Sequence, residues 1–169
     1  MKPFNWKSAT LFTVTSMATA VVIQACGSDN GAVAQTATVV AATPDPIEGT
    51  FQSEVTIRDC MTGVAVTTFR GSTAFHQGGT ATADNNMAPS SKSVALGTWK
   101  KTATGSYTIS LRFFRVLTNG SIGQQRLQRS ITLSADGNTL TSTLSAQILD
   151  PTDNIIQTIC GVETGTRFN

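Results

Sequence analysis

The sequence predicts an all-β fold, a closed antiparallel up-and-down barrel of about eight strands. From Gly49 onward apolar and polar residues alternate with a period of two, as in strands with one buried face. Turn-forming residues interrupt this alternation at even intervals, and no segment shows the spacing of an amphipathic helix. In an open sheet, eight long strands would leave two edges uncovered, whereas closure into a barrel removes both edges.

The first strand follows Gly49, and its apolar residues Phe51, Val55 and Ile57 alternate with polar ones. Asn119-Gly120 and Asp136-Gly137 favour tight hairpins because both pairs readily adopt positive φ angles. A longer polar loop is expected at 84–92. The remaining strands are expected at 64–69, 73–83, 94–102, 107–117, 124–134, 140–149 and 155–168.

The N-terminal part is predicted to be a targeting segment rather than part of the fold. Residues 1–25 form the expected signal peptide, with Lys2 and Lys7 before an apolar run that is too short for a confident membrane-spanning helix. Residues 26–47 are small, polar and proline-containing, which predicts a flexible tether. The barrel domain is expected to occupy residues 48–169.

The end of the apolar run, Ile23-Gln24-Ala25-Cys26, resembles the lipobox of bacterial lipoproteins. The resemblance implies that Cys26 is the lipidated first residue of the mature chain, anchored to the cell envelope at the outer membrane or its periplasmic face. Gln24 departs from the small or apolar residue that is usual at this position. Ordinary secretory cleavage after Ala34 is the alternative, although it would leave Asp29 inside the cleaved leader.

The start of the domain, Gly49-Thr50-Phe51, followed by a small up-and-down barrel, resembles the lipocalin or calycin group and the allene-oxide-cyclase-type barrels. Phe51 stands where lipocalins carry a tryptophan. The segments at 73–80 and 97–100 also resemble exported bacterial proteins of this type. The resemblance implies a fold and does not imply an activity.

Two cysteines fall within the domain, Cys60 near the end of the first strand and Cys160 within the last. The first and last strands of a closed meander are neighbours, and an exported protein enters an oxidising compartment. We therefore expect a disulfide across the barrel seam, with two buried free thiols as the alternative. Two cysteines and one histidine are too few ligands for a zinc site, so no metal or cofactor is predicted.

Five bulky or polar side chains are the candidates for lining a ligand cavity: Phe75, His76, Trp99, Tyr107 and Phe113. The alternative is that the aromatic residues simply form the core. His76 is the single histidine and lies beside Gly78 and Gly79, which suggest a bulge or a close backbone approach. A lone histidine is more often a structural hydrogen-bonding group than a catalytic one.

Charged residues make up 13% of the chain, against about 25% in typical globular proteins. Removal of a leader that contains Lys2 and Lys7 leaves a nearly neutral protein, which excludes an electrostatic nucleic-acid interface. Four charged residues could gather inside the barrel, but the apolar residues of the first strand occupy its inner face, so the alternation favours the solvent face for them. These residues are Glu54, Arg58, Arg112 and Glu163.

The sequence thus favours a cell-envelope module that binds an apolar small ligand or a partner. A structural or interaction lipoprotein with a filled core is an alternative. A barrel-pocket cyclase or isomerase is another, although no hydrolase, metalloprotease or nucleotide-binding motif is present. An outer-membrane barrel is disfavoured because the strand at 124–134 is polar where an apolar outer band is needed.

Overall fold

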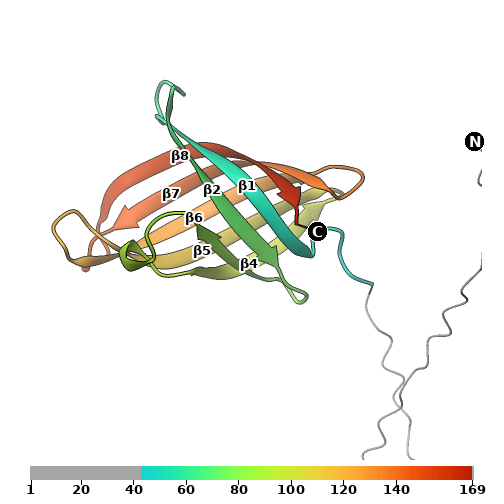
Figure 1. The fold of residues 1–169 in the computed structure, drawn as a ribbon, viewed down its shortest axis with the longest axis horizontal. Helices are drawn as coiled ribbons and strands as arrows, with labels where there is room; N and C mark the ends of the chain where they lie inside the picture. The colour runs from blue at the N-terminus through green and yellow to red at the C-terminus, as the bar shows by residue number, and fades with distance from the viewer. Residues whose placement is uncertain (1–42, 169) are drawn as a thin grey trace, which may run out of the picture. The chain divides into compact units, whose positions relative to one another are not determined.

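The computed structural model describes residues 43–168, in which eight antiparallel strands close into a barrel, as predicted (Figure 1). Each strand pairs with the next, and β8 pairs back with β1 from Phe51↔Arg167 to Arg58↔Cys160. A single turn of 3-10 helix, Pro89–Ser91, lies in the β3–β4 loop. The strands are β1 (Gly49–Arg58), β2 (Ala65–Phe75), β3 (Thr80–Asn85), β4 (Ala95–Ala103), β5 (Ser106–Val116), β6 (Ile122–Leu133), β7 (Thr139–Leu149) and β8 (Ile155–Arg167).

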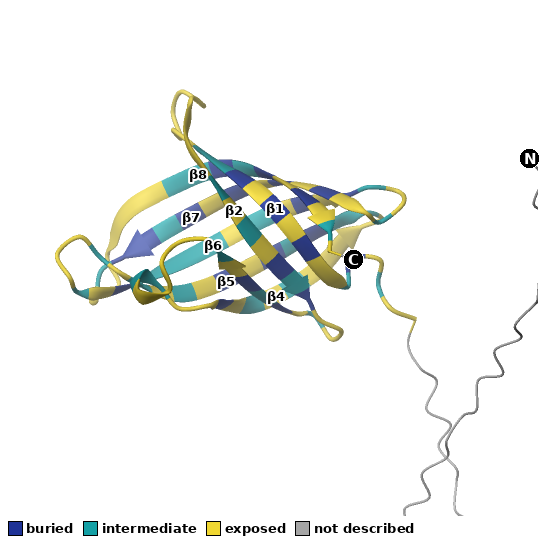
Figure 2. Cartoon of the chain, viewed as in Figure 1, coloured by how far each residue is buried: buried dark blue, intermediate teal, exposed yellow. Residues whose placement is uncertain are grey.

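Buried and exposed residues alternate along the strands, as the banded colouring of Figure 2 shows. Strand β7 is the clearest case, because Leu140, Ser142 and Leu144 face inward while the threonines between them face outward. Successive strand residues point to opposite faces of a sheet, so a period of two fills a barrel on one side and leaves its other side polar. The pattern that predicted the fold is therefore also the pattern that divides the interior from the surface.

Two expected strands have different bounds in the structure. The predicted break at residues 70–72 is wrong, because β2 runs without interruption through Gly71 to Phe75. The predicted strand at 73–83 is also wrong, since it divides at a turn where Gly78 and Gly79 have φ angles of 86° and 84°. A side chain is strained at such positive φ angles, so this glycine pair forms a hairpin turn rather than a bulge. The expected close backbone approach is present, because the Gly79 carbonyl oxygen accepts a hydrogen bond from the Trp99 N–H over 2.7 Å.

One end of the barrel is closed by aromatic side chains that stack across its interior. Phe51, Phe75, Trp99 and Tyr107 make successive edge-to-face contacts, with ring centroids 5.8, 6.3 and 5.9 Å apart. Such contacts contribute about 0.5–1.5 kcal/mol each beyond the burial of area. The Arg167 guanidinium lies 4.6 Å from the centre of the Phe51 ring and completes the closure.

The segment before β1 also belongs to this closed end. Ile47 is fully buried, and Tyr107 donates its hydroxyl hydrogen to Asp45 Oδ1 over 2.5 Å. Burial and this hydrogen bond raise the pKa of Tyr107 to about 12. Arg167 donates to the carbonyl oxygens of Pro46 and Glu48. Residues 45–47, which the sequence grouped with the tether, therefore pack with the barrel.

The connections divide between the two ends of the barrel. The turns at 76–79, 104–105 and 134–138 lie at the closed end, where the described chain also begins and ends (Figure 1). The loops at 59–64, 86–94, 117–121 and 150–154 lie at the opposite end. Within residues 43–168 no helix is long and apolar enough to cross a membrane. The expected signal peptide and Cys26 lie outside the described residues.

Candidate functional site

The end of the barrel opposite the aromatic closure is hollow. A cavity of about 370 Å³ extends into the interior there, within the range of about 300–1,000 Å³ that is usual for small-molecule sites. Most of its wall is apolar. Its apolar lining residues include Val55, Phe69, Phe113, Leu127, Leu144 and Ile148.

The cavity exists because small residues replace large ones on the inner face. On β2, Gly71 lines the cavity while Phe75, four residues further along, fills the closed end. On β4, Ala95 and Trp99 repeat this arrangement. An eight-stranded barrel has an interior that side chains can fill or that can hold one small ligand. This barrel is filled in one half and open in the other.

A buried ion pair lies at the polar side of the cavity. Arg129 Nη1 donates to both carboxylate oxygens of Glu163, over 2.9 and 3.1 Å, and also to Thr73 Oγ1. Ser142 donates to Glu163 Oε2 over 2.7 Å. The Arg129 side chain is 10% exposed and that of Glu163 only 2%. Glu163 is thus fully partnered in the interior, as a buried carboxylate requires.

A second arginine, Arg115, lines the cavity near its open end. Its Nη1 donates to Gln125 Oε1 over 2.8 Å, while its Nε is buried without a hydrogen-bond partner. Burial lowers the pKa of the Arg115 guanidinium. Among the described residues no carboxylate lies within ion-pair distance of Arg115. The cavity therefore contains a cation whose charge the protein does not balance.

The rim of the open end carries exposed apolar side chains on all of its loops or their flanking strand ends. Exposure reaches 94% for Met61 in the β1–β2 hairpin. Contiguous exposed apolar patches mark contact with a ligand, a partner or a membrane, whereas single exposed apolar residues are ordinary. The other members of this rim are Val64, Met87, Val94, Val116, Ile122 and Ile155.

The structure separates the five side chains expected to line a ligand cavity. Phe113 lies in the cavity wall. Phe75, Trp99 and Tyr107 form the aromatic closure at the other end. His76 is exposed in the β2–β3 turn at that same end, where its Nε2 is 3.0 Å from Thr82 Oγ1. Of the five, Phe113 alone borders the cavity.

The charged residues weighed as a cluster do not come together. Glu54, Arg58 and Arg112 are exposed on the outer face, as the alternation favoured. The same expectation is wrong for Glu163, which is 3% exposed inside the barrel. Its partner Arg129 was not among the candidates, although it shares the inner face of β6 with Leu127 and Ile131. The sequence did indicate this position, because Arg129 falls on the same alternate residues of its strand as Leu127 and Ile131.

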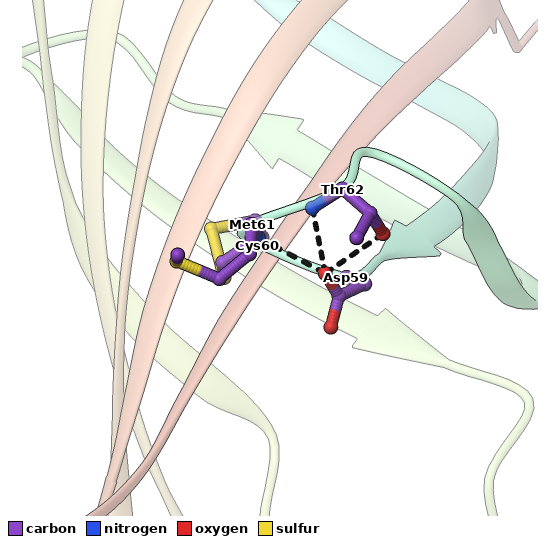
Figure 3. Close-up of a disulfide and its surroundings, with 5 residues drawn as sticks. Asp59, Cys60, Met61 and Thr62 are labelled. Atoms are coloured by element: carbon purple, nitrogen blue, oxygen red, sulfur yellow. Dashed lines mark hydrogen bonds between the residues drawn. A yellow bond between two sulfur atoms is a disulfide. The ribbon is translucent and has the colours of Figure 1, made fainter.

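The predicted seam disulfide is present. Cys60 and Cys160 are bonded with their Cα atoms 5.2 Å apart and join the β1–β2 hairpin to β8 (Figure 3). Asp59 Oδ1 accepts hydrogen bonds from the backbone N–H groups of Met61 and Thr62 and from the Thr62 hydroxyl. This tight turn beside the bridge holds Cys60 against the last strand.

In the part of the chain that the structure describes, no three His, Cys, Asp or Glu side chains are grouped to hold a metal ion.

Comparisons of the chain with protein-family models, curated proteins and solved structures found no match.

Proposed function

We propose that the chain is a cell-envelope lipoprotein whose barrel binds an apolar small ligand, as lipocalin-like barrels do. The observation that carries this proposal is the apolar cavity of about 370 Å³ at the open end. The exposed apolar rim supports it, because a ligand that enters or leaves the cavity passes over that surface. The alternative, a structural or interaction lipoprotein, requires a filled core. Only the closed half of the barrel is filled.

The cavity is expected to bind the amphipathic fluorescent dye ANS, an aromatic sulfonate, with saturable stoichiometry near one. Ala146 is buried in the cavity wall, so Ala146→Phe should fill the space and weaken binding about tenfold or more, the equivalent of about 1.4 kcal/mol. Titration of dye fluorescence at constant protein concentration measures both quantities. Ala103→Phe is the size-matched control, since Ala103 is exposed on β4. Equal binding by the two variants would place the dye outside the cavity.

The lipid anchor on Cys26 is the second part of the proposal. Its support is the lipobox-like sequence that ends at Cys26 and the polar segment that follows. Metabolic labelling with a fatty-acid analogue should label the wild-type chain and leave Cys26→Ser unlabelled. Labelling that survives in Cys26→Ser would rule out Cys26 as the lipidation site, and unlabelled wild type cleaved after Ala34 would favour ordinary secretion.

A further inference from the structure

The charges around the cavity do not cancel. Its lining includes three basic side chains, of which Arg129 is paired with Glu163 and Lys92 with Asp84. Arg115 is left over, with no acidic partner among the described residues. A charge in a low-dielectric site is costly unless a counter-charge or hydrogen bonds compensate it. The cavity is therefore electrostatically complementary to a ligand that carries one negative charge.

The Arg115 guanidinium has one edge engaged and one edge free of protein partners. Gln125 accepts a hydrogen bond from Nη1, whereas the buried Nε has no acceptor. Nε has almost no exposed surface, and Nη2 makes no hydrogen bond to the described residues, so Nη2 is the donor left for a ligand oxygen. Gln125 holds the planar group through Nη1 and so fixes its orientation.

We propose that Arg115 is the headgroup site of the cavity and that the ligand is an amphipathic monocarboxylate with an apolar tail. This inference rests on the proposed ligand-binding function and specifies the chemistry of the ligand. Arg115 lies near the open end of β5, and the apolar wall of Phe113, Leu127 and Leu144 continues from it into the barrel. The carboxylate is bound near the mouth and the tail fills the interior.

The size of the cavity guides the choice of test ligands. Its volume of about 370 Å³ lies near the lower end of the range of about 300–1,000 Å³ that is usual for small-molecule sites. Decanoate is a saturated acid of medium length suited to such a space, and decanol is its uncharged counterpart of nearly equal length.

Displacement of ANS from the full chain by decanoate, decanol and acetate tests the proposal, with the affinity of each variant for ANS, itself a monoanion, measured first. Wild-type protein should bind decanoate about ten- to a hundredfold more tightly than decanol, because a hydrogen-bonded charge pair adds to the same tail contacts. Acetate at equal concentration should displace no dye. Arg115→Gln should reduce the affinity for decanoate to that for decanol or below, and leave decanol binding unchanged. Arg112→Gln, an exposed arginine on the same strand, should behave as wild type.

The possible failures are distinguishable. If neither decanoate nor decanol displaces the dye, the proposed ligand-binding function itself is wrong. If wild type binds both equally, or if acetate competes as well as decanoate, the headgroup assignment is wrong while the binding function stands. The comparison of the two ligands on wild type needs no variant, so it holds even if Arg115→Gln does not fold. Arg115→Lys keeps the positive charge but lacks the planar guanidinium with its several N–H donors. It should therefore retain part of the preference for decanoate.

Discussion

Reduction of the Cys60–Cys160 disulfide is expected to lower the melting temperature of the barrel by on the order of 10 °C. The bridge spans 100 residues of sequence, and loss of a native disulfide typically costs about 2–5 kcal/mol through the greater freedom of the unfolded chain. Its position adds a local effect, because it joins the β1–β2 hairpin to the strand that closes the barrel. Thermal unfolding with and without a reductant measures the change.

The double variant Cys60→Ser/Cys160→Ser separates loss of the cross-link from other effects of the reductant. It should melt at the same temperature as the reduced wild type and show no further response to reductant. An unchanged melting temperature in both would mean that the β1–β8 hydrogen-bond ladder closes the barrel without help. Non-reducing mass analysis of wild type should find the oxidised form, two hydrogens lighter than the reduced form.

The substitution Glu163→Leu is expected to destabilise the domain by about 3–5 kcal/mol, because it leaves the Arg129 guanidinium buried without its counter-charge. Ser142 and Thr73 cannot replace the lost charge, and Arg129 Nε already has no partner in the interior. Urea unfolding of wild type and variant measures the difference in the free energy of unfolding. The magnitude is large because removal of one partner from a buried pair exposes the full desolvation cost of the other.

The double variant Arg129→Met/Glu163→Leu provides the decisive comparison. Apolar residues of similar volume often replace a buried ion pair without loss of stability, so the double variant should be more stable than Glu163→Leu alone. Glu54→Leu, an exposed substitution on β1, should change the free energy of unfolding by less than about 0.5 kcal/mol. A Glu163→Leu variant as stable as Glu54→Leu would mean that water reaches Arg129 in the native state.

The barrel was predictable because apolar and polar residues alternate along most of the domain and turn-forming residues interrupt this alternation at regular intervals. The strand pairing follows from it, and so does the seam disulfide. The turn at Gly78 and Gly79 was mislocated because two glycine sites, Gly71 and the pair, compete as breaks in one polar stretch. Sequence alone does not show which glycine has an extended φ angle and which has a positive one.

The site was less predictable because it depends on which inner-face residues lie at the same height in the barrel. The aromatic residues were candidates for lining a cavity, with a place in the core as the alternative, and most of them fill the closed end. The cavity is defined by small residues such as Gly71 and Ala95, which carry no chemical signal of their own. Arg115 and Arg129 were detectable, since each falls on the apolar face of its strand, where a charged residue needs a specific reason.

An even number of antiparallel strands returns the chain to the end of the barrel from which it started. Both described termini therefore leave from the closed end, and the opening is on the opposite side. A surface, label or fusion partner attached through either terminus would leave the opening unobstructed. The proposed ligand would then enter along the barrel axis, from the end away from the described termini.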